Sequence, residues 1–76
     1  MFDSRSKRAK KAILDIFHEI QINLENNYKD LAIDARKKAE TELERLKEDN
    51  QLSQRDYTGL KATLDDYTKR MAGYHH

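Results

Sequence analysis

Two neighbouring residues, His18 and Glu19, come nearer to a catalytic motif than any other part of this sequence. In helical zinc proteases a second histidine follows four residues after the first, so that both imidazoles bind one metal ion. Ile22 stands at that position here, and the pair of zinc ligands is therefore missing. A single histidine on a helix is more often a surface or packing residue, and we expect no metal site.

Adjacent carboxylates occur at Glu48–Asp49 and at Asp65–Asp66. Successive residues of a helix point to different sides, so both are poor candidates for a catalytic pair. The chain also has no Gly-rich phosphate loop and no nucleophile motif around Ser or Thr. Three short helices leave little room for a pocket of several hundred Å3. We therefore predict a protein that is not an enzyme and that needs no cofactor.

The composition narrows the class of protein. The 76 residues make at most one domain, 1–76, and the absence of cysteine fits a reducing compartment. Charged residues are 38% of the chain, yet its net charge is only +1, which is less basic than most nucleic-acid-binding domains. We expect a soluble, cytoplasmic protein without a secretory signal, with a peripheral position at the inner face of the membrane as an option. His75 and His76 are either native or the remnant of a tag.

Apolar residues recur at steps of three and four, which predicts helices. The expected helices cover about residues 5–25, 28–49 and 54–72, and there is no proline to break them. Their apolar faces are formed by Ala9, Ile13, Ile16, Phe17, Ile20 and Leu24; by Tyr28, Leu31, Ala35, Ala39, Leu43 and Leu46; and by Tyr57, Leu60, Leu64, Tyr67, Met71 and Tyr74. The prediction is an all-α, antiparallel three-helix bundle.

The turn between the second and third helices has the clearest signals. Ser53 is placed as an N-cap, and Asp56 stands three residues later, as in a capping box. Leu52 and Tyr57 flank this start as a hydrophobic staple. Asn50 suits the left-handed residue that closes the preceding helix. These signals predict a helical hairpin that turns at about residues 49–53.

The break between the first and second helices is less clearly marked. Asn27 could cap the second helix, with Asp30 behind it, but no glycine or proline forces a turn. The apolar pattern also passes through Tyr28 almost in phase. The alternative is one long helix over both segments, followed by a C-terminal helix and packed as a dimer.

Leu14, His18 and Ile22 lie well off the main apolar face of the first helix. One interpretation is that this helix contacts both others and that Ile22 is a singly exposed residue. The other is that Leu14 and Ile22, together with Ile33, form a surface for a partner.

Residues 4–11, here called the basic lead, contain five positive charges, at Arg5, Lys7, Arg8, Lys10 and Lys11. Positive charge at a helix N-terminus opposes the helix dipole, so these residues do not serve helix stability. The basic lead is a solvated tail, a contact for a membrane surface or acidic protein, or a nucleic-acid contact. No aromatic residue is interleaved with it, as stacking on single-stranded nucleic acid would require.

Several segments together resemble the immunity proteins of pediocin-like bacteriocins. They are the basic "RSKRAKKA", the first helix "ILDIFHEIQINLEN", the charged second helix "YKDLAIDARKKAETELERL", and the tail "AGYHH". The resemblance covers about two-thirds of the chain. That family typically has four helices and a longer chain, whereas three helices are expected here.

The resemblance implies a cytoplasmic helical bundle that protects a producing bacterium from its own bacteriocin. Its partner would be the bacteriocin together with a sugar-uptake permease in the membrane, recognised from the cytoplasmic side. In that family specificity is associated with the C-terminal part, which corresponds here to the third helix and the tail around Tyr74.

We therefore expect a non-enzymatic bundle that works through protein–protein contact, with bacteriocin immunity as its most specific form. The candidate contact residues are Leu14, Ile22, Tyr74, Lys7, Lys10 and Lys11. Two alternatives stay open: a nucleic-acid-binding accessory protein that uses the basic lead, and a structural dimerisation module.

Overall fold

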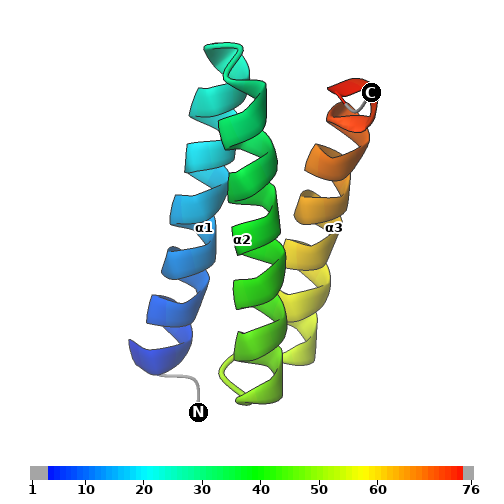
Figure 1. Cartoon of the computed structure of the whole chain (residues 1–76). Helices are drawn as coiled ribbons and strands as arrows, with labels where there is room; N and C mark the ends of the chain where they lie inside the picture. Colours follow the sequence, from blue (N-terminus) through cyan, green and yellow to red (C-terminus); the bar gives the residue numbers. More distant parts are fainter. Residues whose placement is uncertain (1–3, 75–76) are drawn as a thin grey trace.

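The computed structural model describes residues 4–74 and the side chains of residues 6–73. Its helices are α1 (Ser4–Glu25), α2 (Lys29–Glu48) and α3 (Gln54–Arg70), and a short 3-10 turn, η1 (Ala72–Tyr74), follows. Successive helices run antiparallel, so the start of α1 and the α2–α3 turn lie at one end of the molecule (Figure 1). The molecule measures 44 × 17 × 15 Å along its principal axes. The prediction of an all-α three-helix bundle is confirmed.

The most extensive packing in the bundle is between α1 and α2. Ala32, Ala35 and Ala39 of α2 are buried in the core that Ile13 and Ile20 of α1 also enter. Small side chains at these three positions let the two helices approach, while the larger isoleucines fill the space between them. The α1–α2 hairpin is therefore the main body of the core.

Both turns of the bundle are built around an asparagine in the left-handed region, Asn27 with φ 61° and Asn50 with φ 58°. At the end of α1 the Asn27 N–H donates to the Leu24 carbonyl at 3.2 Å, and the Tyr28 N–H donates to the Asn23 carbonyl at 2.8 Å. This pair of bonds is the Schellman motif, which ends a helix and turns the chain away.

The interpretation of Asn27 as the N-cap of the second helix is therefore wrong. Asn27 closes α1 instead, and Tyr28 occupies the N-cap position of α2 without a side-chain capping bond. A left-handed residue cannot lie inside a right-handed helix. The chain consequently folds back at residues 26–28, and the alternative of one continuous helix is not adopted.

The α2–α3 turn lies where it was predicted, with Asn50 and Ser53 in their predicted roles, whereas the Asp56 carboxylate pairs with Lys10. A second Schellman motif ends α2, since the Asn50 N–H donates to the Lys47 carbonyl and the Gln51 N–H to the Leu46 carbonyl. The Ser53 hydroxyl then accepts a hydrogen bond from the Asp56 N–H at 3.0 Å and caps α3.

The third helix is attached less deeply than the other two. Leu64 is its buried residue, and Tyr57, Leu60 and Tyr67 are only partly buried against the core. The rings of Tyr67 and Phe17 pack at a centroid distance of 5.7 Å, and the Tyr67 hydroxyl lies 3.3 Å from Gln21 Oε1. A few side chains therefore fix α3 against α1.

Candidate interaction surface

His18 and Glu19, the residues nearest to a catalytic motif, lie on the surface of α1. His18 is exposed on α1, while Glu19 lies 3.5 Å from the Lys38 ammonium of α2. The Glu19 carboxylate thus links two helices across the surface of the hairpin. Within residues 4–74, no group of three or more His, Cys, Asp or Glu side chains is placed to hold a metal ion.

The adjacent carboxylates of α3 turn toward different partners. Asp65 pairs with Lys61 at 3.4 Å, and Asp66 pairs with Arg70 at 3.2 Å. Both are ion pairs at four-residue spacing on the solvent side of one helix. Such pairs stabilise an exposed helix by a few tenths of a kcal/mol.

Among residues 6–73, four large apolar side chains are exposed to solvent. Their exposed fractions are 53% for Leu14, 41% for Ile22, 55% for Tyr28 and 53% for Leu31. Leu14 and Ile22 lie on the outer side of α1, as their positions on the helical wheel predicted. They are two turns apart on the same helix, about 12 Å along its axis.

The exposure of Tyr28 and Leu31 corrects the sequence analysis, which placed both on the apolar face of the second helix. Tyr28 precedes α2 and belongs to the turn. Leu31 lies in the first turn of α2 but off the face that packs against α1, since the next residue, Ala32, is fully buried. The mismatch between periodicity and burial comes from the Schellman turn, which resets the phase of the pattern.

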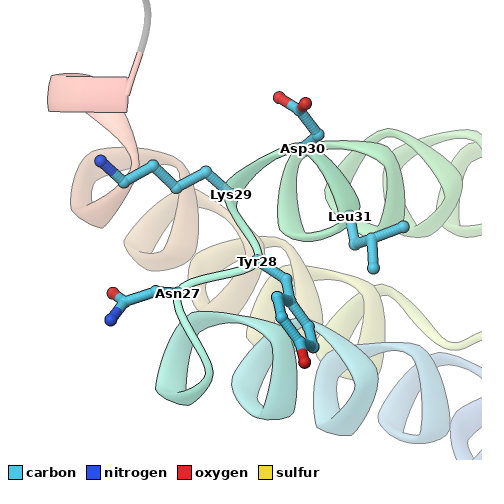
Figure 2. A pocket seen from close by; sticks show the side chains of 5 residues that line it. All are labelled: Asn27, Tyr28, Lys29, Asp30 and Leu31. Atoms are coloured by element: carbon cyan, nitrogen blue, oxygen red, sulfur yellow. The ribbon is translucent and has the colours of Figure 1, made fainter.

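A hollow of about 440 Å3 lies at the α1–α2 turn and is lined by Asn27, Tyr28, Lys29, Asp30 and Leu31. In Figure 2 the side chains of Tyr28 and Leu31 extend to the same side of the turn, whereas Lys29 and Asp30 point elsewhere. Two exposed apolar side chains thus line one hollow at this turn. The sequence marks this turn only weakly, because the apolar pattern continues through Tyr28 almost in phase and no glycine or proline follows Asn26 and Asn27.

Ile33 does not join Leu14 and Ile22. It is partly buried and packs against the core. Together with Arg36 of α2, it borders a second hollow of about 380 Å3, whose other wall is formed by Thr68, Met71 and Ala72. The sequence-based surface of Leu14, Ile22 and Ile33 is therefore not one surface in the folded chain.

The charges of the basic lead have different surroundings. Lys10 is half-buried and lies 3.6 Å from Asp56 at the start of α3, and Lys11 pairs with Asp15 at 3.1 Å. Lys7 and Arg8 are exposed, and neither has an ion-pair partner among the residues that the structure describes. The uncompensated positive charge of the described basic lead therefore concentrates at these two residues.

Two carboxylates fix side chains around the α2–α3 hairpin. The hydroxyl of Tyr57 donates to Glu44 Oε2, and this hydrogen bond raises the pKa of Tyr57, with partial burial and the negative charges of Glu44 and Asp65 adding to the effect. On the other side of α2, the guanidinium of Arg45 binds Glu42 and lowers the pKa of that carboxyl. Both interactions stabilise the helices around the turn.

The remaining sequence-based candidate, Tyr74, has its side chain outside the described part of the chain, as does Arg5. Comparison with protein-family models, with curated proteins and with solved structures found no match to this chain. Among residues 4–74, no helix is long and apolar enough to cross a bilayer.

Proposed function

We propose that this chain is a non-enzymatic, cytoplasmic helical bundle that works through contact with a protein partner. The observation that carries the proposal is the group of exposed apolar side chains, above all Tyr28 and Leu31 beside each other at the α1–α2 turn. Aromatic residues are enriched in protein interfaces, where they bury a large area at a small cost in conformational entropy. The α1–α2 turn presents both side chains to solvent.

Bacteriocin immunity is the most specific form of the proposal. It is supported by the resemblance of the basic lead, the first two helices and the C-terminal tail to the immunity proteins of pediocin-like bacteriocins. The typical members have four helices, whereas residues 4–74 of this chain form three. In the proposed complex, a helix of the partner covers apolar surface that a fourth helix would otherwise cover.

Protection of cells tests the immunity function. The intact protein is expressed in a bacteriocin-sensitive strain, its level is checked by blot, and the cells are challenged with a panel of pediocin-like peptides. We expect a large gain in survival against one member of the panel. Equal survival with and without the protein, at good expression, would remove bacteriocin immunity from the proposal.

The contact residues are tested by charge substitution. Leu14→Lys with Ile22→Lys, and separately Tyr28→Lys with Leu31→Lys, place charges on exposed positions and leave the core intact. We expect at least one of these folded double variants to lose protection. The matched control is Thr41→Lys with Thr63→Lys, which adds the same charge at exposed positions of α2 and α3. Full protection by both apolar-site variants would exclude these side chains as the contact.

A nucleic-acid-binding function is the second candidate, because Lys7 and Arg8 are exposed without ion-pair partners in the described structure. Binding of this kind weakens with salt, by roughly one log unit in affinity per log unit of salt for each phosphate neutralised. A gel-shift titration at low salt tests it with double-stranded and single-stranded DNA. The absence of any shift would eliminate this candidate.

A further inference from the structure

Five exposed residues follow one another along the outer side of α1. They are Lys7, Lys11, Leu14, His18 and Ile22, here called the outer stripe. The steps between them are four, three, four and four residues, which keeps them on one face of a helix. The buried residues Ile13, Ile16 and Ile20 lie on the opposite side of the same helix. α1 is thus a helix with two faces that carry apolar side chains, one inside the bundle and one outside.

The outer stripe combines positive charge with aliphatic side chains. From residue 4 to residue 14 the chain has five basic residues and no acidic one. Asp56 and Asp15 offset Lys10 and Lys11, so among the side chains of residues 6–73 in this segment Lys7 and Arg8 hold the charge that can attract an anionic surface. Leu14 follows one turn beyond Lys11 with more than half of its side chain exposed.

We propose that the outer stripe, with Arg8 beside it, docks on an anionic phospholipid bilayer. Lysine and arginine are attracted to the negative surface of such a membrane. An exposed aliphatic side chain adds binding free energy when it moves from water into the boundary between headgroups and acyl chains. The outer stripe spans about 22 Å of helix at 1.5 Å per residue. That is half of the 44 Å length of the molecule, so the bundle would lie along the membrane with α1 against it.

A bilayer fits this surface better than a nucleic acid does. The outer stripe contains no aromatic residue for base stacking, and two of its five members are aliphatic. Aliphatic side chains make no favourable interaction with a charged phosphate backbone. The inference does not depend on the proposed protein partner, because attraction to lipid needs only the charges and the side chains of α1.

Vesicle co-sedimentation tests the proposal directly. The full chain is mixed with vesicles of phosphatidylglycerol and phosphatidylcholine, and separately with vesicles of phosphatidylcholine alone. We expect weak, reversible binding to the anionic vesicles that decreases as salt is added, and little binding to the neutral ones. Equal binding to both kinds of vesicle, or to neither, would overturn the proposal.

The decisive variant reverses charge at the start of α1. Lys7→Glu with Arg8→Glu is expected to lower the bound fraction about tenfold, because both attractions become repulsions. Acidic residues near a helix N-terminus favour the helix dipole, so this variant should keep its helical content. The matched control, Lys37→Glu with Lys69→Glu, changes the net charge equally at exposed positions of α2 and α3. An equal loss in the control would show attraction by net charge and overturn the outer stripe as the site.

The aliphatic part is tested by Leu14→Ser with Ile22→Ser, which should weaken binding severalfold while its salt dependence stays the same. Unchanged binding would overturn the role of these side chains. Two further measurements complete the test. If sedimentation of the free protein shows a dimer that Leu14→Ser disrupts, the outer stripe is a dimer interface and the membrane proposal is overturned. If a gel shift shows that the protein binds DNA more tightly than it binds vesicles, the outer stripe is a nucleic-acid site and the proposal is likewise overturned. The vesicles contain no protein, so a negative result here leaves the protection assay unaffected.

Discussion

The hydroxyl of Tyr57 in α3 donates a hydrogen bond to Oε2 of Glu44 in α2 at 2.5 Å, across the α2–α3 turn. The Lys47 ammonium lies 4.5 Å from the centre of the same ring. The partly buried Tyr57 thus makes two contacts with α2: its hydroxyl donates to Glu44, and its ring contacts the Lys47 ammonium. Because α3 has few buried side chains, this contact is an important part of its attachment.

Replacing Tyr57 with Phe should lower the free energy of unfolding by about 1 kcal/mol, the usual net value of a hydrogen bond. The phenylalanine ring still packs against the core, so the decrease in unfolding free energy measures the contribution of the hydroxyl group. Urea unfolding followed by circular dichroism measures it. Tyr28→Phe is the control, since its side chain is exposed in the turn, and an equal loss in both variants would contradict the assigned role of the hydrogen bond.

The same hydrogen bond predicts a pH dependence at alkaline pH. The pKa of Tyr57 is raised in the folded chain, chiefly by its bond to Glu44. A raised pKa means that the stabilisation is complete below the unfolded-state value of about 10 and is lost as the pH rises through the folded-state value. The wild-type free energy of unfolding should therefore fall in that window more steeply than that of Tyr57→Phe. Parallel curves for the two proteins would refute this.

The α2–α3 turn could be predicted because its signals are local. The Ser53 hydroxyl caps the Asp56 N–H, and the turn at Asn50 closes α2 through backbone bonds, all within one turn of helix. The α1–α2 turn was harder to interpret, because asparagine serves both as an N-cap and as a left-handed C-terminal residue. Only the direction of the chain after Asn27 distinguishes the two roles, and that direction depends on the packing of α1 against α2.

Substitutions of Asn27 should separate the effect of its backbone conformation on stability from the effect of its side chain. With φ 61°, the position is strained for residues that carry a Cβ and free for glycine. We expect Asn27→Gly to be neutral or stabilising and Asn27→Ala to cost about 1 kcal/mol. Thermal unfolding gives the difference.

Alanine at this position also favours continuation of α1 into α2, so Asn27→Ala should increase the fraction of dimer in sedimentation. The same exchanges at Asn50 form a matched pair, since its φ of 58° is nearly the same. Equal stability of the Gly and Ala variants at both positions would contradict the left-handed assignment.

Two isoleucines two residues apart on α1 should respond very differently to truncation. Ile20 is fully buried, whereas Ile22 is exposed. Ile20→Ala should cost about 2–5 kcal/mol of unfolding free energy, because it leaves a cavity in the core. Ile22→Ala should change it by less than about 0.5 kcal/mol. Chemical denaturation of the two single variants measures both, and a comparable loss at Ile22 would mean that this side chain belongs to the core.

The residues of the candidate surface could be predicted from the sequence only in part. A helical wheel is enough to place Leu14 and Ile22 outside, because their angular distance from the core residues is a property of one helix. The pairing of Lys10 with Asp56 depends on how α1 lies against α3, and the wheel carries no such information. The exposure of Leu31, next to the fully buried Ala32, depends on which face of α2 packs against α1. Surface features that need two helices were therefore the ones that sequence reasoning missed.

Glu42 should give the hairpin a small acid-side pH dependence. Its pKa is lowered, first by the hydrogen bond from Arg45 and also by the Arg45 charge, while partial burial opposes the shift. A lowered pKa means that the stabilisation is present above the unfolded-state value, about 4.3, and is lost as the pH falls through the folded-state value. Glu42→Gln should lack this part of the acid-side loss. Urea unfolding across that range compares the variant with the wild type, and identical pH profiles would exclude the effect.

Enlarging an alanine of α2 should separate α1 from α2. Ala39 is fully buried, and the close packing of the two helices leaves no space for three more carbon atoms at this position. Ala39→Leu should therefore cost about 1–3 kcal/mol, although leucine adds apolar surface, because side chains and backbone must shift to admit it. Thr41→Leu, two residues away on the exposed side, has no such constraint and is the control. If Ala39→Leu were as stable as the wild type in chemical denaturation, the core between α1 and α2 would have to be looser than the structure shows.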